Sequence, residues 1–194
     1  MRFRSGRYAR NWVRNVVGIG NSVGFVEPLE ATALHVISSQ CCTLADALSD
    51  SQCAPPPSII DFYNAYGADA WDSIRDFLSV HYRFNTRLDT PFWQAARREV
   101  KLHTAEPIVE FYRENGPSNL AAQRFIHSSN TFGIEGYLTL LTGQGVPHEK
   151  PYTPASAEQK TWENYQRTWR QAAQNAFGVK EALAVFRSPG MRWE

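Results

Sequence analysis

The sequence predicts an α+β protein that is mostly helical, with short strands at its N-terminus and a long helical region after them. Apolar residues follow one another without alternation at Val16, Val17 and Ile19, which indicates a strand that is buried on both faces. After Pro57 the apolar residues recur at spacings of three and four, which is typical of amphipathic helices. A chain of 194 residues can bury one substantial core. Nothing in it demands a second domain.

Composition excludes several classes of partner. The formal net charge is +1 and the charged residues are interspersed, so no nucleic-acid partner is indicated. The 3 cysteines form no C-x-x-C pair, which suits a reducing compartment, and no Cys/His spacing predicts a metal site. The sequence shows no signal peptide and no apolar run near the ~18 residues that a membrane span needs. We therefore expect a cytoplasmic protein without a membrane partner.

Residues 1–14 alternate aromatic and basic side chains and predict one or two strands with a turn at Ser5 and Gly6. Such a surface can bind nucleic acid. A solvated strand face, or a contact to a cofactor phosphate, is favoured because no basic run continues elsewhere.

A glycine-rich turn follows the predicted strand. Gly18, Gly20 and Gly24 lack a Cβ, so their backbone N–H groups can approach a ligand closely or adopt positive φ. Within this turn, Gly20 to Gly24 also matches G-x-S-x-G, with Ser22 as the nucleophile of a serine hydrolase. A G-x-G-x-x-G dinucleotide fingerprint fits less well, because the glycine spacing has one residue too many.

Pro28 separates this turn from a predicted helix. It excludes a helix through residues 25–27, where a nucleophile elbow would need one. A helix can open at Glu30 and continue through His35 toward Ser49. Its first N–H groups are then free and its positive dipole end faces the turn. The sequence therefore predicts an anion site at this helix start.

The remaining chain is predicted to be helical. Pro55 to Pro57 form a stiff connector, and Asp89, Thr90 and Pro91 supply a cap and a first helical residue. The connection before Pro91 brings two aromatic pairs face to face, as a hydrophobic joint or as a substrate pocket. These pairs are His81 with Tyr82 and Phe92 with Trp93. Residues 159–176 predict an amphipathic helix that packs inward through Trp162, Tyr165, Trp169 and Ala172.

The run from Trp12 to Thr32 resembles the flavin-dependent tryptophan halogenase family, which carries a G-N-A-x-G-F-x-E-P-L-E-[SA]-T signature. The resemblance implies that Thr32 and Ala33 hold chloride or bromide through backbone N–H groups, and that Glu30 stands near a catalytic lysine. It places FAD against Gly18, Gly20, Asn21, Gly24, Phe25, Pro28 and Leu34. Ser22, Ala31 and Ala33 depart from the residues that this family usually has.

A second run is similar to the part of the family that sandwiches an indole. It ends in His81 and Tyr82 and resumes with Asp89 to Trp93, so the resemblance implies that His81, Tyr82, Phe92 and Trp93 contact the substrate. Members that act on free tryptophan have an acidic residue at the position of Leu88, which contacts the substrate amino group. Because a buried ammonium without a partner is costly, we expect a different aromatic substrate, such as a phenol, a pyrrole or a carrier-bound indole.

The resemblance covers only the C-terminal portion of the family. The sequence lacks a strand-G-x-G-x-x-G-helix unit, the W-x-W-x-I-P run and the catalytic lysine, so the N-terminal dinucleotide-binding half is expected to be absent. Residues 1–40 are then the last strands, the glycine turn and the helix start of an FAD- and halide-binding domain. Residues 41–194 form a helical substrate-side region.

Two classes of function follow. The first is part of a halogenase, a monooxygenase-like flavoprotein that is inactive as this isolated chain and takes reduced FAD from a separate flavin reductase. The second is an inactive helical interaction protein derived from the same family.

Overall fold

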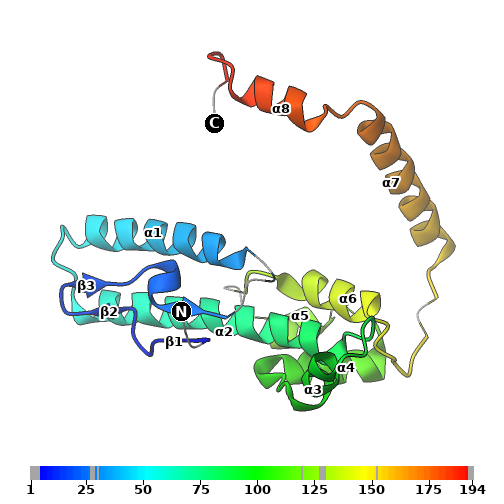
Figure 1. Ribbon diagram of the computed structural model, residues 1–194, viewed down its shortest axis with the longest axis horizontal. Coiled ribbons are helices and arrows are strands. Elements are labelled where there is room, and N and C mark those ends of the chain that lie inside the picture. The colour runs from blue at the N-terminus through cyan, green and yellow to red at the C-terminus, as the bar shows by residue number, and fades with distance from the viewer. Residues whose placement is uncertain are drawn as a thin grey trace. The chain divides into compact units, whose positions relative to one another are not determined.

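The computed structural model describes residues 5–26, 29, 31–118, 120–126, 130–151 and 153–191. It confirms the α+β, mostly helical fold (Figure 1). The chain divides into two compact units, Met1–Pro151 and Tyr152–Glu194. Sequence analysis did not predict this division. The boundary expected near residue 40 concerns the FAD-binding domain and stays a prediction.

Four short strands form two antiparallel pairs near the N-terminus. β1 (Gly6–Arg7) pairs with β4 (Gly24–Phe25), and β2 (Trp12–Val13) pairs with β3 (Val16–Val17). The turn expected at Ser5 and Gly6 is wrong, because Gly6 pairs with Phe25 in the first ladder.

The strand expected at Val16 and Val17 is present as β3, but its expected burial on both faces is wrong. Val16 is 66% exposed, because the only strand paired with β3 among the described residues is β2. Val17 packs on one side, against the cluster of Trp12, Ala47 and Tyr63.

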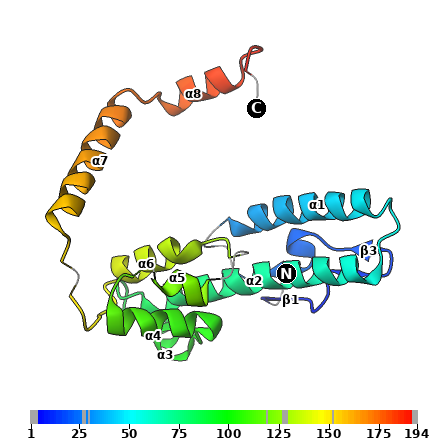
Figure 2. The same ribbon diagram turned by 180° about the vertical axis from the view of Figure 1, so that it is seen from behind.

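The strands pack against two long helices. α1 (Thr32–Asp50) and α2 (Pro57–Phe84) lie side by side in both views (Figures 1 and 2). Pro55 to Pro57 join them as expected, and Pro57 occupies the first turn of α2, where its missing N–H does no harm.

The other helices of the first unit gather around the C-terminal half of α2. They are α3 (Pro91–Glu99), α4 (Glu106–Asn115), α5 (Leu120–Phe125) and α6 (Gly133–Gly143), with the short 3₁₀ segment η2 (His103–Ala105). A second 3₁₀ segment, η1 (Gly20–Ser22), lies against α1. Their main core contains Phe77, Val80, Ile108, Val109, Tyr112, Ile134, Tyr137 and Leu141. The buried Asp76 accepts hydrogen bonds from the backbone N–H and the hydroxyl of Thr104, which attaches η2 to α2.

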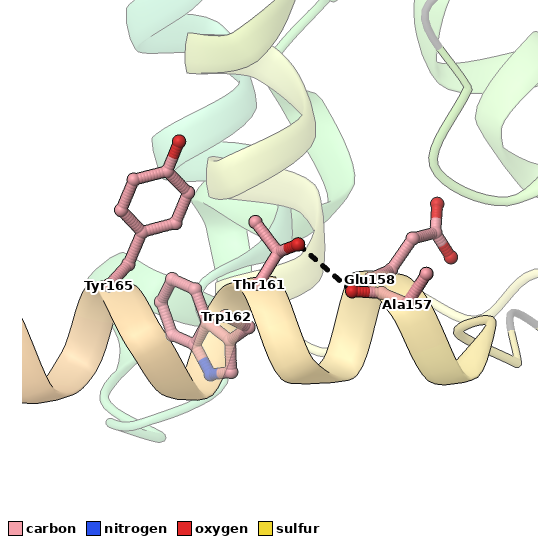
Figure 3. Close-up of a pocket in the computed structure, with 5 residues that line it drawn as sticks. All are labelled: Ala157, Glu158, Thr161, Trp162 and Tyr165. Carbon is pink, nitrogen blue, oxygen red and sulfur yellow. Dashed lines mark hydrogen bonds between the residues drawn. The ribbon is translucent and has the colours of Figure 1, made fainter.

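The second unit contains α7 (Ser156–Gln174) and α8 (Val179–Phe186). The helix expected over residues 159–176 is confirmed, and its inward packing stays a prediction. Within this unit, no described residue of α7 or α8 is buried, and Figure 3 shows Trp162 and Tyr165 projecting from α7. Trp162, Tyr165 and Trp169 are 53%, 54% and 56% exposed.

An ion pair ties β1 to α2 and should make the first unit sensitive to acid. Arg7 donates from Nε and Nη2 to Asp72 at 3.0 and 2.8 Å, and this hydrogen bonding holds the pKa of Asp72 below its usual 3.8. A carboxyl pKa that is depressed on folding stabilises the fold above the unfolded pKa and loses this effect as pH falls through the folded pKa.

We expect Arg7→Leu to lower the free energy of unfolding at pH 7 by about 0.5–1 kcal/mol. The difference from wild type should shrink as pH falls below about 4. Urea unfolding at several pH values measures it, with Arg10→Leu as the control, since Arg10 and Asp61 are farther apart and more exposed. A difference that stays constant with pH would show that the carboxylate pair is not its source.

Candidate functional site

The glycine turn is fastened to α1. Gly20 has a φ of +56°, and a Cβ built there would lie 2.1 Å from Cγ1 of Ile37. The Gly20 N–H donates to Oε1 of Gln40 at 2.7 Å, and Gln40 is completely buried. Glycine is therefore required at position 20 by its backbone conformation and by close packing.

The other end of the turn packs on α2. A Cβ at Gly24 would come within 2.5–2.6 Å of the indole ring of Trp71, which is itself buried. The Cβ sides of both glycines thus face the protein, and what they allow is the close approach of the turn to the two helices.

Two polar side chains of α2, those of Asn64 and Tyr63, hold the N-terminal segment by hydrogen bonds. Oδ1 of Asn64 accepts the N–H groups of Asn11 and Trp12 at 2.7 and 2.8 Å, and Nδ2 of Asn64 donates to the Trp12 carbonyl at 3.2 Å. The Tyr63 hydroxyl donates to the Gly18 carbonyl at 3.4 Å. Burial raises the pKa of Tyr63 to about 12, so the hydroxyl keeps its proton at neutral pH.

Sequence analysis missed Gln40 and Asn64. Both are polar residues on helix faces that are otherwise turned toward the core, and that mismatch is the signal that could have found them. Nε2 of Gln40 and Nδ2 of Asn11 are buried without a hydrogen-bond partner in the described part of the chain.

The first turn of α1 follows the glycine turn. Its cap residue, Ala31, provides no side-chain hydrogen bond, and the first turn contains no acidic residue. Among the described residues, no side chain therefore caps the N–H groups of Thr32 and Ala33, which lie at the positive end of the helix dipole. Leu34, on the same turn, is 69% exposed. The predicted site residues Pro28 and Glu30 lie outside the described residues.

The alternative of a nucleophile elbow is wrong. Ser22 is followed by strand β4 instead of a helix. Its hydroxyl donates to the Ile19 carbonyl at 2.8 Å and accepts the Ile19 N–H at 2.9 Å, so it closes its own turn. The described strands form antiparallel pairs, which also contradicts a dinucleotide-binding βαβ unit here.

Three of the four predicted substrate residues come together where α2 ends and α3 begins. The rings of Tyr82 and Trp93 stack with centroids 5.6 Å apart. Phe92 meets Trp93 edge to face at 5.1 Å and is 61% exposed. We call Tyr82, Phe92 and Trp93 the aromatic cluster.

His81 lies apart from this cluster. Its ring meets Phe77 edge to face at 4.9 Å, and its Nδ1 is 3.2 Å from the Phe77 carbonyl oxygen. Adjacent residues on a helix project about 100° apart, so His81 and Tyr82 cannot share one face. Phe77 in turn stacks on Phe132 at 3.8 Å.

Sequence analysis also missed Phe132. It packs against the main core and against a smaller cluster that contains Trp71, Val36 and Ala33. Phe132 therefore connects the start of α1 with the region around His81.

Arg97 organises the loop between α2 and α3. It donates to the carbonyls of Asn85 and Leu88 at 3.0 Å each and pairs with Asp89. The cap and the first helical residue expected from Asp89, Thr90 and Pro91 are confirmed: Thr90 is the cap residue and Pro91 begins α3, although Thr90 makes no side-chain cap bond. Leu88 is 55% exposed.

The described part of the chain contains no group of three or more His, Cys, Asp or Glu residues that could hold a metal ion. None of its helices is both long enough and apolar enough to cross a membrane.

The glycine turn, the start of α1 and the aromatic cluster all lie in the first unit, and comparison with known proteins assigns the chain to a family. The family model described as tryptophan halogenase matches residues 1–163. The chain therefore belongs to the tryptophan halogenase family.

Individual relatives agree with this assignment. The chain is 40% identical over 121 residues to tryptophan 6-halogenase ThaL of Streptomyces albogriseolus, covering 62% of this chain and 22% of ThaL. It is 32% identical over 161 residues to tryptophan 7-halogenase RebH of Lentzea aerocolonigenes, covering 78% of this chain and 30% of RebH.

A solved structure shows the same relationship. MibH, a lathipeptide tryptophan 5-halogenase, matches with a TM-score of 0.77 and 36% identity, covering 95% of this chain and 36% of MibH. The chain thus spans less than half the length of the relatives that it matches.

Proposed function

We propose that this chain supplies the halide side and the substrate side of a flavin-dependent halogenase acting on an electron-rich aromatic. The observation that carries the proposal is the start of α1. It comes a few residues after a glycine turn that is held against both long helices, and it offers backbone N–H groups that no described side chain caps.

FAD is implied by the family, and the described residues fit one side of it. The turn from Gly20 to Gly24 is held against both long helices. Asn21 in this turn and Leu34 in α1 are exposed, so both are accessible to a flat ring. In the proposal the turn and Leu34 hold the flavin, and a separate flavin reductase supplies it in reduced form. The bound flavin, with oxygen, supplies the oxidising power that converts a halide ion into an electrophilic halogen.

The halide is assigned to the backbone N–H groups of Thr32 and Ala33. A helix N-terminus favours an anion because the unpaired N–H groups and the dipole act together. The first turn of α1 itself contains no acidic residue.

The aromatic cluster is assigned to the substrate. Stacked and edge-to-face rings offer an indole-sized surface. Leu88 supplies no carboxylate for a free amino group, and the loop that contains it is held by Arg97. MibH is a lathipeptide tryptophan halogenase. We therefore assign to this chain an indole that carries no free ammonium, within a peptide or on a carrier, in preference to free tryptophan.

The test uses a completed protein, which we define as this chain joined to the part of RebH that it does not match. The completed protein, FAD, a flavin reductase and bromide are incubated with free tryptophan and with a tryptophan-containing peptide, and products are identified by mass spectrometry. We expect bromination of the peptide in excess over free tryptophan. Absence of any brominated product from a folded, FAD-loaded protein would contradict the proposal.

Glu30 provides a sharper prediction. A Glu30 carboxylate near the halide site would repel the halide ion. A lysine from the remainder of the enzyme is therefore needed beside this carboxylate. We expect Glu30→Gln in the completed protein to slow halogenation at least about tenfold, or about 1.4 kcal/mol of barrier. Reoxidation of the flavin by oxygen should hardly change, since that step does not involve the lysine.

Stopped-flow flavin absorbance and product analysis separate the two steps. Glu99→Gln serves as the matched control, because Glu99 lies at the far end of α3. Unchanged product yield in Glu30→Gln would remove Glu30 from the mechanism.

A further inference from the structure

Phe132 lies where two apolar clusters of the first unit meet. It packs against the main core and also against a smaller buried cluster. The smaller cluster contains Val36, Trp71, Ile74 and Leu78. Ala33, one of the two residues assigned to the halide, packs against this same cluster. Phe132 is therefore linked through shared neighbours to the start of α1.

The backbone around Phe132 is held in place by its own turn. Oδ1 of Asn130 accepts the N–H groups of Phe132 and Gly133 at 3.0 and 3.3 Å. Gly133 has a φ of +59°, which a residue with a Cβ adopts only with strain. A Cβ at Gly136 would lie 3.2 Å from Cβ of Phe132 and 3.4 Å from the Phe77 ring. This glycine thus leaves room for both side chains beside α6.

α1 and α2 run antiparallel, which decides where the start of α1 points (Figure 1). The end of α1 packs on the beginning of α2, where Ala47 and Tyr63 share a cluster. The beginning of α1 packs farther along α2, where Val36 and Leu78 share the smaller cluster. The N–H groups assigned to the halide point out of this helix start. They are therefore directed toward the C-terminal end of α2 and the aromatic cluster.

A series of ring contacts leads from Phe132 to the predicted substrate residue His81. The Phe77 ring stacks on Phe132 with the centroids 3.8 Å apart and the planes 11° apart. It also meets the rings of His81 and Tyr137 edge to face at 4.9 and 5.1 Å. Because Phe77 and Tyr137 are buried, Phe77 has little room to leave this stack. A smaller side chain at position 132 would let the Phe77 ring shift, and His81 with it.

We propose that Phe132 is a positioning residue, which acts through Phe77 and His81 to set which carbon of the substrate ring faces the halide site. The proposal rests on the proposed function. In that reaction one ring carbon forms a bond to the electrophilic halogen and then loses its proton. A misplacement of about 1 Å can slow such a step about 100-fold, so a neighbouring carbon then competes for the halogen.

The experiment compares the position of bromination in variants of the completed protein. Phe132→Leu removes the stacked ring and keeps an apolar side chain. With bromide and the tryptophan-containing peptide, the ratio of the brominated isomers should change at least about tenfold, as measured by chromatography and NMR. Phe132→Tyr keeps the ring and should keep the wild-type ratio. Reoxidation of the flavin by oxygen should hardly change in either variant.

Phe111→Leu is the matched control. Phe111 packs against the same main core and meets Phe125 edge to face at 5.8 Å, so this variant also loses one aromatic contact. The smaller cluster beside Ala33 does not include Phe111, and the isomer ratio should stay that of wild type. Circular dichroism verifies that each variant folds. If Phe132→Leu does not fold, Phe132→Met takes its place with the same expectation, since methionine fills irregular gaps without a ring.

A measurement without turnover separates this proposal from the proposed function. Saturation-transfer NMR on the completed protein, with FAD and bromide but no flavin reductase, shows which indole protons of the peptide lie against the protein. The pattern of these protons should differ between wild type and Phe132→Leu. It should be the same in wild type and Phe111→Leu.

The two readouts together assign every failure. A changed proton pattern without any brominated product contradicts the proposed function alone. Product with the same isomer ratio and the same proton pattern in wild type and Phe132→Leu contradicts the role of Phe132 alone. An equal change in Phe111→Leu also overturns that role, because it assigns the effect to a general loss of core packing. No saturation transfer to the indole contradicts both.

Discussion

Gly24→Ala is expected to lower the free energy of unfolding of the first unit by about 2–3 kcal/mol, in the range of overpacked cores. The new methyl group would lie 2.5–2.6 Å from the ring of Trp71. That ring is buried in a cluster with Val36, Ile74 and Leu78 and cannot move without displacing them. Urea unfolding followed by circular dichroism measures the change.

Two further variants identify the cause. Gly143→Ala is the control, because a Cβ there meets nothing within 4 Å, and its effect should be neutral or slightly stabilising. In a Trp71→Leu background, Gly24→Ala should be much less harmful, since the smaller side chain leaves room. Equal effects of Gly24→Ala in both backgrounds would show that Trp71 is not what constrains the turn.

Gln40→Leu is expected to destabilise the first unit by about 1–3 kcal/mol. Leucine fills a similar volume but leaves the buried Gly20 N–H, now 2.7 Å from Oε1 of Gln40, without an acceptor. Because that bond also fixes the glycine turn, the completed protein should bind FAD more weakly, as measured by fluorescence titration.

Gln123→Leu is the matched control, since Gln123 is an exposed residue of α5. If Gln40→Leu and Gln123→Leu have the same stability and FAD affinity, the bond to Gly20 contributes nothing to the fold or to the turn.

Helix boundaries in the first unit were predictable because local residues set them. Pro57 and Pro91 each stand in the first turn of a helix, a position that sequence alone identifies. The exposure of Val16 was not predictable. Periodicity identifies an apolar face, but it does not say which surface covers that face.

The same distinction applies to the candidate site. Tyr82, Phe92 and Trp93 could be grouped from sequence because a short connection joins their helices. Gln40, Asn64 and Phe132 were not identified from the sequence. Their partners Gly20, Trp12 and Phe77 lie 20, 52 and 55 positions away along the chain. The roles of Gly18, Gly24, Phe25 and Leu34 at the flavin, and of Thr32 and Ala33 at the halide, stay predictions.

Equilibrium dialysis with FAD tests the central claim most directly, which is that this chain supplies one side of a shared flavin site. The isolated chain and the completed protein are dialysed in parallel against oxidised FAD. We predict that the completed protein retains FAD, and that the isolated chain retains none at micromolar concentration, because the glycine turn contacts only one side of the cofactor. Micromolar binding of FAD by the isolated chain would contradict this account.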